Sequence, residues 1–399
     1  MGGPRWQKLQ QAGDCPGPRS SHCMAYANGR IYMFGGELQP RVPVPAATYV
    51  YDLADSTWSQ LKTAGACPGP RVAATMAAIG SKLYLFGGRT GIDMGEGATG
   101  DLFVLDTAAA TWAAAQPSTD CSSSTPAAPP ARSYHAMTTA GGKLYVFGGC
   151  GAAGRLADLW RFDPATGAWQ QLPGCESVGA RGGSVLVASG DGSQLLLMGG
   201  FNGDEMRDCH SYDIAAATWN CPACCDAVDT AAVNINGSCA AKKGEAGCAS
   251  QHVSSLAMPL ARSVFGAAVH TGCSSSSSSA AAASGCPHAG HIVAFGGEVS
   301  PSDKGHAGAG NFCAAAYCLS PPGHPCGEAC THATAAGSNI DAAGSHRHSG
   351  WHVLDAAGEG PGPRGWFAAA AVAGGDLVVH GGLGGDISRM GDMFRLCMH

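Results

Sequence analysis

Three side chains that could hold a metal ion lie within nine residues of one another: Glu298, Asp303 and His306. Two carboxylates and one imidazole form a hard donor set, which suits Fe(II) or Mn(II) better than a soft metal. Three protein ligands would leave coordination positions open for a substrate or water, so the metal could act as a Lewis acid or a one-electron donor. The alternative is structural: Glu298 and Asp303 would then pair with backbone N–H groups of their loop or with arginines.

Arginines that recur through the chain suggest a second kind of chemistry, because a guanidinium recognises sulfate or phosphate in a bidentate way. Six arginines occupy the same point of a repeated pattern, and for these a structural role is favoured, in which each satisfies loop carbonyls of its own repeat. They are Arg19, Arg71, Arg132, Arg181, Arg262 and Arg364. For Arg89, which stands outside this pattern, anion binding and a structural role both stay open.

The elements that must position these residues come from one short stretch used six times, a hydrophobic run that ends in two glycines. Its copies span residues 31–36, 83–88, 144–149, 195–200, 292–297 and 377–382. A strand that ends in Asp often follows, as at 48–52, and a tryptophan strand such as the one at Trp58 closes most repeats. These runs are short, rich in Val, Tyr, Phe and Trp, and bounded by Gly, Pro and Asp, which is typical of β-strands.

Four antiparallel strands per repeat, arranged radially, form a β-propeller blade. The sequence therefore predicts an all-β fold, a six-bladed propeller. The predicted blades span approximately 19–61, 71–115, 132–172, 181–222, 262–354 and 364–399. The last repeat lacks a closing tryptophan strand, and residues 6–9 precede the first repeat. We expect residues 6–9 to complete the sixth blade and close the ring, which removes an open sheet edge.

Three segments rich in Ala, Ser, Gly and Cys do not fit the repeat. They span approximately 221–258, 270–290 and 321–349. Such biased tracts bury too little apolar surface to order themselves, so they are interpreted as mobile insertions.

The repeat arginines and the loops after Gly-Gly should surround one opening of the propeller, which we call the mouth. This follows because the first strand of an antiparallel meander starts, and the second ends, at the same end of the blade. Tyr134 and Trp366 follow repeat arginines and are predicted to wall a pocket there, since polar groups between aromatic walls are typical of ligand sites. The mouth also collects the charged residues Glu37, Arg41, Arg89, Arg155, Asp386 and Arg389.

The Gly-Gly strand, the Tyr-Asp step and the tryptophan strand resemble kelch repeats, over essentially the whole chain apart from the three insertions. The stretches 34–44, 295–310 and 361–366 are similar to the plant kelch proteins grouped as nitrile-specifier, epithiospecifier and thiocyanate-forming proteins. Those proteins are six-bladed propellers that depend on ferrous iron. They redirect the breakdown of glucosinolate aglucones towards nitriles and related products.

The resemblance implies a site for Fe(II). The ligands proposed in that family are a Glu, an Asp four residues on and a His eight residues on, and Glu298 and His306 fall at the outer two positions. Ser302 stands at the middle position, and Asp303, one residue later, is the substitute that the loop offers. The family also places an arginine after the second Gly-Gly to meet the sulfate of the substrate, and Arg89 matches it.

The composition excludes some classes of protein. The 399-residue chain has a formal net charge of −6, which argues against a general nucleic-acid binder. It has no run of about 18 apolar residues, and its first residues lack the apolar core of a signal peptide. We therefore expect no membrane span and a cytoplasmic or nuclear protein.

The 19 cysteines are interpreted mostly as reduced thiols, since no export signal precedes them. Two clusters leave zinc binding open, although their spacing matches no zinc-finger pattern and the alternative is a solvated loop. One cluster comprises Cys221, Cys224, Cys225, Cys239 and Cys248, and the other Cys313, Cys318, Cys326 and Cys330 with nearby histidines.

Two functions from different classes remain open. In the first, a nitrile-specifier-like protein binds Fe(II) and a small anionic, sulfur-containing molecule at the mouth and steers its breakdown. Glu298, His306 and Asp303 would hold the iron, and Arg89 the anion. In the second, the same mouth binds a peptide or partner protein without catalysis, as a protein–protein interaction scaffold, because a fold alone does not decide function.

Overall fold

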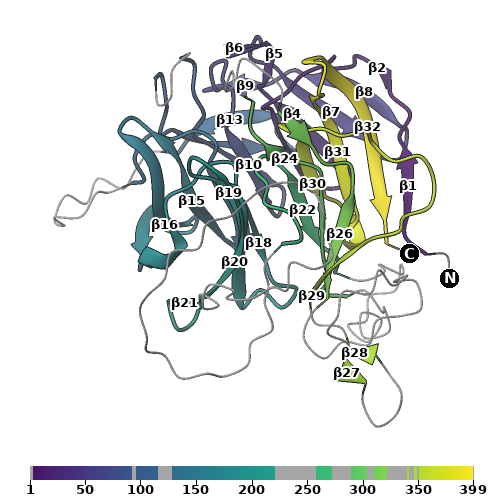
Figure 1. Cartoon of the computed structure of the whole chain (residues 1–399). Helices are drawn as coiled ribbons and strands as arrows, with labels where there is room; N and C mark the ends of the chain where they lie inside the picture. The colour runs from purple at the N-terminus through teal and green to yellow at the C-terminus, as the bar shows by residue number, and fades with distance from the viewer. Residues whose placement is uncertain are drawn as a thin grey trace, which may run out of the picture.

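The molecule is built from six sheets, each with four antiparallel strands, arranged as the blades of a propeller (Figure 1). A short fifth strand pairs in parallel with the last strand of blade 1 and of blade 2. The computed structural model describes residues 3–91, 96–115, 128–220, 258–271, 289–302, 310–320, 339–340, 346–347 and 350–398. The predicted all-β, six-bladed propeller is confirmed, and most of the three predicted insertions lie outside the described residues. No helix in the described part of the chain is long and apolar enough to cross a lipid bilayer.

Each of the first three blades takes its four strands in chain order. Blade 1 comprises β3 (Cys23–Ala27), β4 (Arg30–Phe34), β7 (Thr48–Asp52) and β8 (Thr57–Leu61). Blade 2 comprises β10 (Thr75–Ile79), β11 (Lys82–Phe86), β12 (Leu102–Asp106) and β13 (Thr111–Ala114). Blade 3 comprises β14 (Ala136–Ala140), β15 (Lys143–Gly151), β16 (Gly154–Asp163) and β17 (Ala168–Leu172).

The remaining blades follow the same order, except that the first strand of the chain completes the last blade. Blade 4 comprises β18 (Val185–Ala188), β19 (Gln194–Phe201), β20 (Glu205–Asp213) and β21 (Thr218–Asn220). Blade 5 comprises β22 (Gly266–Val269), β23 (Ile292–Phe295), β26 (Ala316–Ser320) and β29 (Gly350–Val353). Blade 6 comprises β30 (Ala368–Ala371), β31 (Leu377–Leu383), β32 (Arg389–Cys397) and β1 (Arg5–Lys8).

Short elements join or extend the blades. Two small hairpins follow Gly-Gly, β5 (Glu37–Gln39) with β6 (Val42–Pro43) and β24 (Glu298–Ser300) with β25 (Asn311–Phe312). The others are β2 (Ala12–Gly13), β9 (Ala64–Gly65), β27 (Asn339–Ile340), β28 (His346–Arg347) and the 3-10 helices η1 (Glu176–Val178) and η4 (Ala373–Gly375). Glu298 therefore opens a strand, whereas the sequence placed it in a loop.

The first strand of each blade lies innermost. Each one contacts the first strand of the next blade, and β30 of blade 6 contacts β3 of blade 1, so these strands close around one axis. They surround a channel of about 410 Å³, lined by side chains that include Ala77, Thr138 and Ala268. The axis of the propeller is thus open, and its mouth lies where these inner strands begin.

The ring is closed by β1, which pairs antiparallel with β32 at the other end of the chain. The two termini lie side by side in Figure 1. The Trp6 side chain is 9% exposed, and its ring meets Phe295 of blade 5 edge-on, with 5.0 Å between ring centroids. The predicted closure of the sixth blade by the N-terminal strand is confirmed, and Trp6 fills the interface between blades 5 and 6.

The paired glycines join neighbouring blades at the mouth. The second glycine of each pair donates its N–H to the carbonyl of the repeat arginine in the next blade, as Gly36 does to Arg71 at 3.0 Å. Blade 6 bonds back to blade 1 through Gly382 and Arg19 at 2.9 Å. A Cβ on the first glycine would meet the same carbonyl, at 2.5 Å from Gly35, so the close approach requires glycine.

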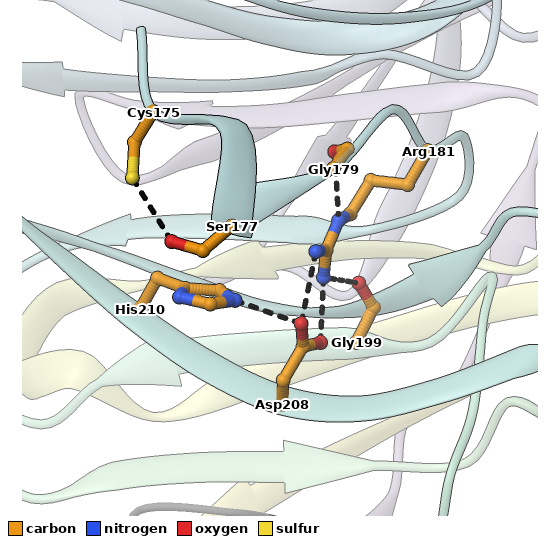
Figure 2. A network of polar contacts seen from close by, with 7 residues as sticks. All are labelled: Cys175, Ser177, Gly179, Arg181, Gly199, Asp208 and His210. Atoms are coloured by element: carbon orange, nitrogen blue, oxygen red, sulfur yellow. Dashed lines mark hydrogen bonds and ion pairs between the residues drawn. The ribbon is translucent and has the colours of Figure 1, made fainter. Parts of the chain in front are cut away.

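The repeat arginines have the structural role that the sequence favoured. In every blade Nη1 donates to the carbonyl of the first glycine of the pair, at 3.0–3.1 Å. Figure 2 shows Arg181, which also donates to both carboxylate oxygens of Asp208 at 2.6 and 2.9 Å and to the carbonyl of Gly179. His210 bonds the same carboxylate at 2.7 Å. The guanidinium groups of the repeat arginines therefore stabilise the backbone of the blades, and their role is structural. We call this backbone, with its glycines and arginines, the frame.

A closed ring of backbone hydrogen bonds circles the axis two residues after the repeat arginines. Each residue donates its N–H to the carbonyl of its counterpart in the preceding blade, at 2.7–3.1 Å. The six members are Ser21, Ala73, Tyr134, Gly183, Val264 and Trp366. All six have positive φ, between 48° and 65°, and five of them are not glycine. The ring fixes the backbone from which every side chain of the mouth projects.

Replacing Trp6 with alanine tests closure of the ring. Because Trp6 is buried between blades 5 and 6, Trp6→Ala should lower the free energy of unfolding by about 3–5 kcal/mol. Urea unfolding followed by circular dichroism measures the loss. Gln7→Ala, at an exposed position of the same strand, is the control and should change it by less than about 0.5 kcal/mol. Similar losses in the two variants would contradict a specific role of Trp6.

Candidate functional site

The mouth is built from two sets of equivalent positions. The first set follows Gly-Gly, and each member forms an antiparallel bridge to the residue after the repeat arginine. Its members, from blade 1 to blade 6, are Glu37, Arg89, Cys150, Phe201, Glu298 and Leu383. The second set pairs with the first across each hairpin, and consists of Pro43, Ala98, Arg155, Glu205, Phe312 and Arg389. We call these the inner and the outer positions.

At two boundaries the outer residue of one blade contacts the inner residue of the next. Arg389 of blade 6 pairs with Glu37 of blade 1 at 3.4 Å. The guanidinium of Arg155 in blade 3 lies 4.7 Å from the ring centroid of Phe201 in blade 4. At these two boundaries the surroundings of a charged side chain therefore come from two neighbouring blades.

Glu37 is a satisfied carboxylate. Besides Arg389, it accepts hydrogen bonds from the hydroxyl of Ser20 at 3.1 Å and from the backbone N–H of Arg41 at 2.5 Å. Its negative charge is balanced within the protein, so this part of the mouth has no need of a bound cation.

Glu298 occupies the same inner position in blade 5 but has different surroundings. Its side chain is 7% exposed, and burial raises its pKa to about 7, while the backbone N–H groups of Gly310 and Ser302 act in the opposite direction. No lysine or arginine in the described residues forms an ion pair with it. Asp303 and His306, the other predicted ligands, lie outside the described residues.

Glu205 is a member of this site that the sequence analysis missed. It occupies the outer position of blade 4, where its carboxylate accepts a hydrogen bond from the hydroxyl of Ser263 at 3.2 Å. Burial raises the pKa of Glu205 to about 8, and the charge of Glu298 adds to this shift. Its Oε2 atom is buried and has no hydrogen-bond partner among the described residues. The sequence does contain a signal for Glu205. This residue occupies the same position at the start of the third strand of its blade as Arg155 in blade 3 and Arg389 in blade 6.

Arginines gather on another part of the mouth. Arg89, at the inner position of blade 2, is 3% exposed, and its guanidinium lies 5.4 Å from the ring centroid of Tyr134. Arg155 of blade 3 lies close enough to the thiol of Cys150 that its charge, like that of Arg89, opposes the rise in pKa that burial gives this thiol. Arg89 and Glu298 stand three blades apart, on opposite sides of a six-bladed ring.

A cavity of about 160 Å³ lies on the axis at the level of the hydrogen-bonded ring. Tyr134 and Trp366 both line it, so the structure places them together at the centre of the mouth. Polar side chains also line it, including His135 and Ser184. The Oγ atom of Ser184 is buried and has no partner among the described residues. The cavity thus offers aromatic walls and polar contacts below the charged rim.

Among the residues that the structure describes, no group of three or more His, Cys, Asp or Glu side chains is arranged to hold a metal. Cys313 and Cys318 form no disulfide in the described part of the chain, and Sγ of Cys318 lies 3.6 Å from Nδ1 of His291. The other cysteines of both predicted clusters lie outside the described residues. Of the predicted iron ligands, only Glu298 can be placed, and Glu205 is the carboxyl group beside it.

A buried histidine below the mouth makes the stability of the protein depend on pH. Burial lowers the pKa of His135 to about 3, and the charge of Arg132 adds to the shift. Between pH 3 and pH 6.5, the usual pKa of histidine, the unfolded chain binds a proton at His135 that the folded protein does not bind. The free energy of unfolding therefore falls as pH decreases below about 6.5.

Replacing His135 with phenylalanine should remove this contribution, because Phe265 and Phe367 occupy the same position in blades 5 and 6. Between pH 7.5 and pH 5.0 the unfolding free energy of the wild type should fall by about 2 kcal/mol more than that of His135→Phe. Urea unfolding at the two pH values measures the difference. Equal pH dependence in both proteins would show that His135 titrates normally in the folded state.

Comparison with known proteins identifies the repeats. Residues 3–125 and 121–235 match the family model of the KLHDC2/KLHL20/DRC7 Kelch-repeats domain. The N-(sulfonatooxy)prop-2-enimidothioate sulfolyase of Thlaspi arvense is 32% identical over 235 residues, which cover 54% of this chain and 65% of that protein. Tip elongation aberrant protein 1 of Schizosaccharomyces pombe is 30% identical over 164 residues, covering 40% of this chain and 14% of that protein.

Kelch domain-containing protein 3 of Homo sapiens is 27% identical over 175 residues, covering 42% of this chain and 44% of that protein. The chain thus spans less than two thirds of the length of each of these three relatives. The resemblance to kelch repeats, and to the plant nitrile-specifier group, is confirmed by these matches. Since the matched family model covers residues 3–235, more than half of the chain, the protein belongs to the family of KLHDC2/KLHL20/DRC7 Kelch-repeats domains.

Proposed function

We propose that the mouth binds Fe(II) together with an anionic, sulfur-containing small molecule and steers the breakdown of that molecule. The observation that carries this proposal is the division of charge across the mouth. Carboxyl groups of Glu205 and Glu298 lie on blades 4 and 5, and guanidiniums of Arg89 and Arg155 lie on blades 2 and 3. A ligand that spans the opening would meet cation-binding groups at one end and anion-binding groups at the other.

The carboxyl side fits Fe(II) by the chemistry of its donors. Carboxylate oxygens are hard ligands, and the buried Oε2 atom of Glu205 has no hydrogen-bond partner in the described residues. Asp303 and His306 remain proposed ligands from the sequence. When bound, iron would supply a Lewis acid or a one-electron donor beside the sulfur of the ligand.

The arginine side suits a sulfate-like group. The Arg89 guanidinium lies over the ring of Tyr134, 5.4 Å from its centroid, and this contact helps to position the guanidinium. A planar guanidinium can donate two parallel hydrogen bonds to two oxygens of one anion. Trp366, whose ring meets Phe312 edge-on with 5.6 Å between centroids, would wall the organic part of the ligand.

The name of the plant relative supports this class of ligand. That protein is a sulfolyase of N-(sulfonatooxy)prop-2-enimidothioate, a compound with a sulfonatooxy anion and a sulfur atom close together. The first group is a partner for Arg89, and the second is a ligand for iron. We therefore choose this compound as the probe for the present protein.

A protein–protein interaction scaffold is the second candidate, and exposed apolar side chains at the mouth favour it. Leu38 and Val42 of the blade 1 hairpin are 55% and 52% exposed, and Ile387 in the neighbouring loop of blade 6 is 45% exposed. Arg389 and Glu37 join these two loops by an ion pair. In this alternative a peptide would lie over the same mouth, and no metal would be needed.

Loading the purified protein with Fe(II) in the absence of oxygen tests the metal. Wild type should bind one iron per chain, and Glu298→Ala should lose it, because a ligand is removed. Elemental analysis of the protein after gel filtration measures the metal. Glu359→Ala, at an exposed position, is the control and should keep the iron. A wild type that retains no iron would leave the interaction scaffold as the function.

Replacing Arg89 tests the anion site independently. Loss of a charged hydrogen-bond donor costs about 1.5–3 kcal/mol, so Arg89→Ala should raise KM for the freshly generated sulfonatooxy probe by roughly 10- to 100-fold. Product formation measured against probe concentration gives KM. Arg30→Ala, which breaks an ion pair on the outer surface of blade 1, should leave KM unchanged. An unchanged KM in Arg89→Ala would exclude this arginine from binding the ligand.

A further inference from the structure

We propose that Glu205 is a second carboxylate ligand of the cation held by Glu298. Glu205 would supply the carboxylate that the position of Ser302 lacks. This inference rests on the proposed function, since it concerns the same metal. The sequence predicted all the ligands from blade 5, to which Glu298 belongs, whereas Glu205 belongs to blade 4.

Two equivalent groups of three residues in the mouth carry the argument. At the boundary of blades 6 and 1 the group consists of Arg389, Ser20 and Glu37. At the boundary of blades 4 and 5 the residues at the same positions are Glu205, Ser263 and Glu298. In each group the serine follows a repeat arginine and bridges to the inner glutamate through its backbone.

The contacts within the two groups correspond. In the first group, Nε of Arg389 donates to the hydroxyl of Ser20 at 3.3 Å, and its Nη2 lies 3.4 Å from Glu37. In the second, the hydroxyl of Ser263 donates to Glu205 at 3.2 Å, and Glu205 lies within electrostatic reach of Glu298. At both boundaries the outer side chain thus bonds the serine that bridges to the inner glutamate.

The two groups differ in charge. At the boundary of blades 6 and 1 the outer residue is a cation and neutralises Glu37. At the boundary of blades 4 and 5 the outer residue is a second acid, and no lysine or arginine of the described chain forms an ion pair with either Glu205 or Glu298. At the boundary of blades 4 and 5 a glutamate thus stands where the boundary of blades 6 and 1 has an arginine. Among the described residues, the two acids have no cationic side chain equivalent to Arg389.

The state of individual atoms points to an ion as the missing partner. Oε1 of Glu205 is held by Ser263, whereas Oε2 is buried and accepts no hydrogen bond from the described residues. Glu298 is anchored by the backbone N–H groups of Ser302 and Gly310. A divalent cation would neutralise both carboxylates at once, and hard oxygen donors favour Fe(II), Mn(II) or Mg(II) over soft metals.

Mn(II) titration of the metal-free, full-length protein tests this assignment without any measurement of activity. The signal of free Mn(II) in electron paramagnetic resonance gives the number of bound ions and the Kd. Wild type should bind one Mn(II) per chain, and Glu205→Gln, which keeps the shape of the side chain, should raise Kd at least about 10-fold. Glu359→Gln is the matched control at an exposed position and should bind Mn(II) like wild type.

Glu205→Arg gives a second, independent measurement. This variant recreates at blades 4 and 5 the arginine–glutamate pair of blades 6 and 1. It should therefore lose Mn(II) binding and, in metal-free buffer, unfold at a higher temperature than wild type. The gain in unfolding temperature separates loss of a ligand from loss of the fold.

Three results would decide against the proposal. Mn(II) binding by Glu205→Gln with the Kd of wild type, while Glu298→Gln loses the ion, would exclude Glu205 as a ligand and leave the proposed function intact. A Glu205→Arg variant that still binds Mn(II) would exclude it as well. A wild type that binds neither Mn(II) nor Fe(II) would overturn both this inference and the metal in the proposed function.

Discussion

The mouth of this propeller depends on a closed ring of six backbone hydrogen bonds around the axis. Five of the six donors are residues other than glycine in the left-handed region, a conformation that costs roughly 1–2 kcal/mol for each L-residue. Such a cost persists only when the surrounding structure fixes the backbone, which here means that each blade is held by both of its neighbours. Closure of the sixth blade by β1 supports the geometry of the mouth, since an open ring would free the N–H of Ser21 at one end and the carbonyl of Trp366 at the other.

Because glycines, arginines and backbone atoms build this frame, the side chains of the mouth are free to differ between blades. The inner positions hold two acids, one arginine, one thiol and two apolar side chains on the same backbone. Their chemistry thus depends on which blade carries them and on the outer residue of the blade before. Arg155 on Phe201, Arg389 on Glu37 and Glu205 beside Glu298 are three outcomes of one geometry.

The sequence predicted the frame well, because each blade repeats the same short-range pattern. The Gly-Gly pairs, the repeat arginines and the closure by Trp6 could all be read from residue spacing. The role of Glu205 could not be predicted from spacing, because its partner Glu298 lies on another blade, about 90 residues further along the chain. The two come together only because the outer position of one blade lies beside the inner position of the next. The position of Glu298 at the start of β24 was also missed, since its pairing partner Phe312 follows a segment of no repeat pattern.

The boundary of blades 4 and 5 and the boundary of blades 6 and 1 have the same backbone but different charges. Their comparison explains how the frame can hold two acids, Glu205 and Glu298, close together. Replacing an arginine by Glu205 removes an ion pair, but the backbone bridge of Ser263 to Glu298 stays at 3.0 Å in both directions, as it is for Ser20 and Glu37 at 2.9–3.0 Å. Blade 5 is in turn joined to blade 4 by two hydrogen bonds of 2.8 Å, from the N–H of Gly200 to the carbonyl of Arg262 and from the N–H of Val264 to the carbonyl of Gly183. The blades that carry the two acids are therefore held together. A cation placed between the two acids would favour the ionised form of both carboxyl groups, because its charge offsets their mutual repulsion. A site of this kind needs no lysine or arginine, and the frame that tolerates it is the same frame that pairs Glu37 with Arg389.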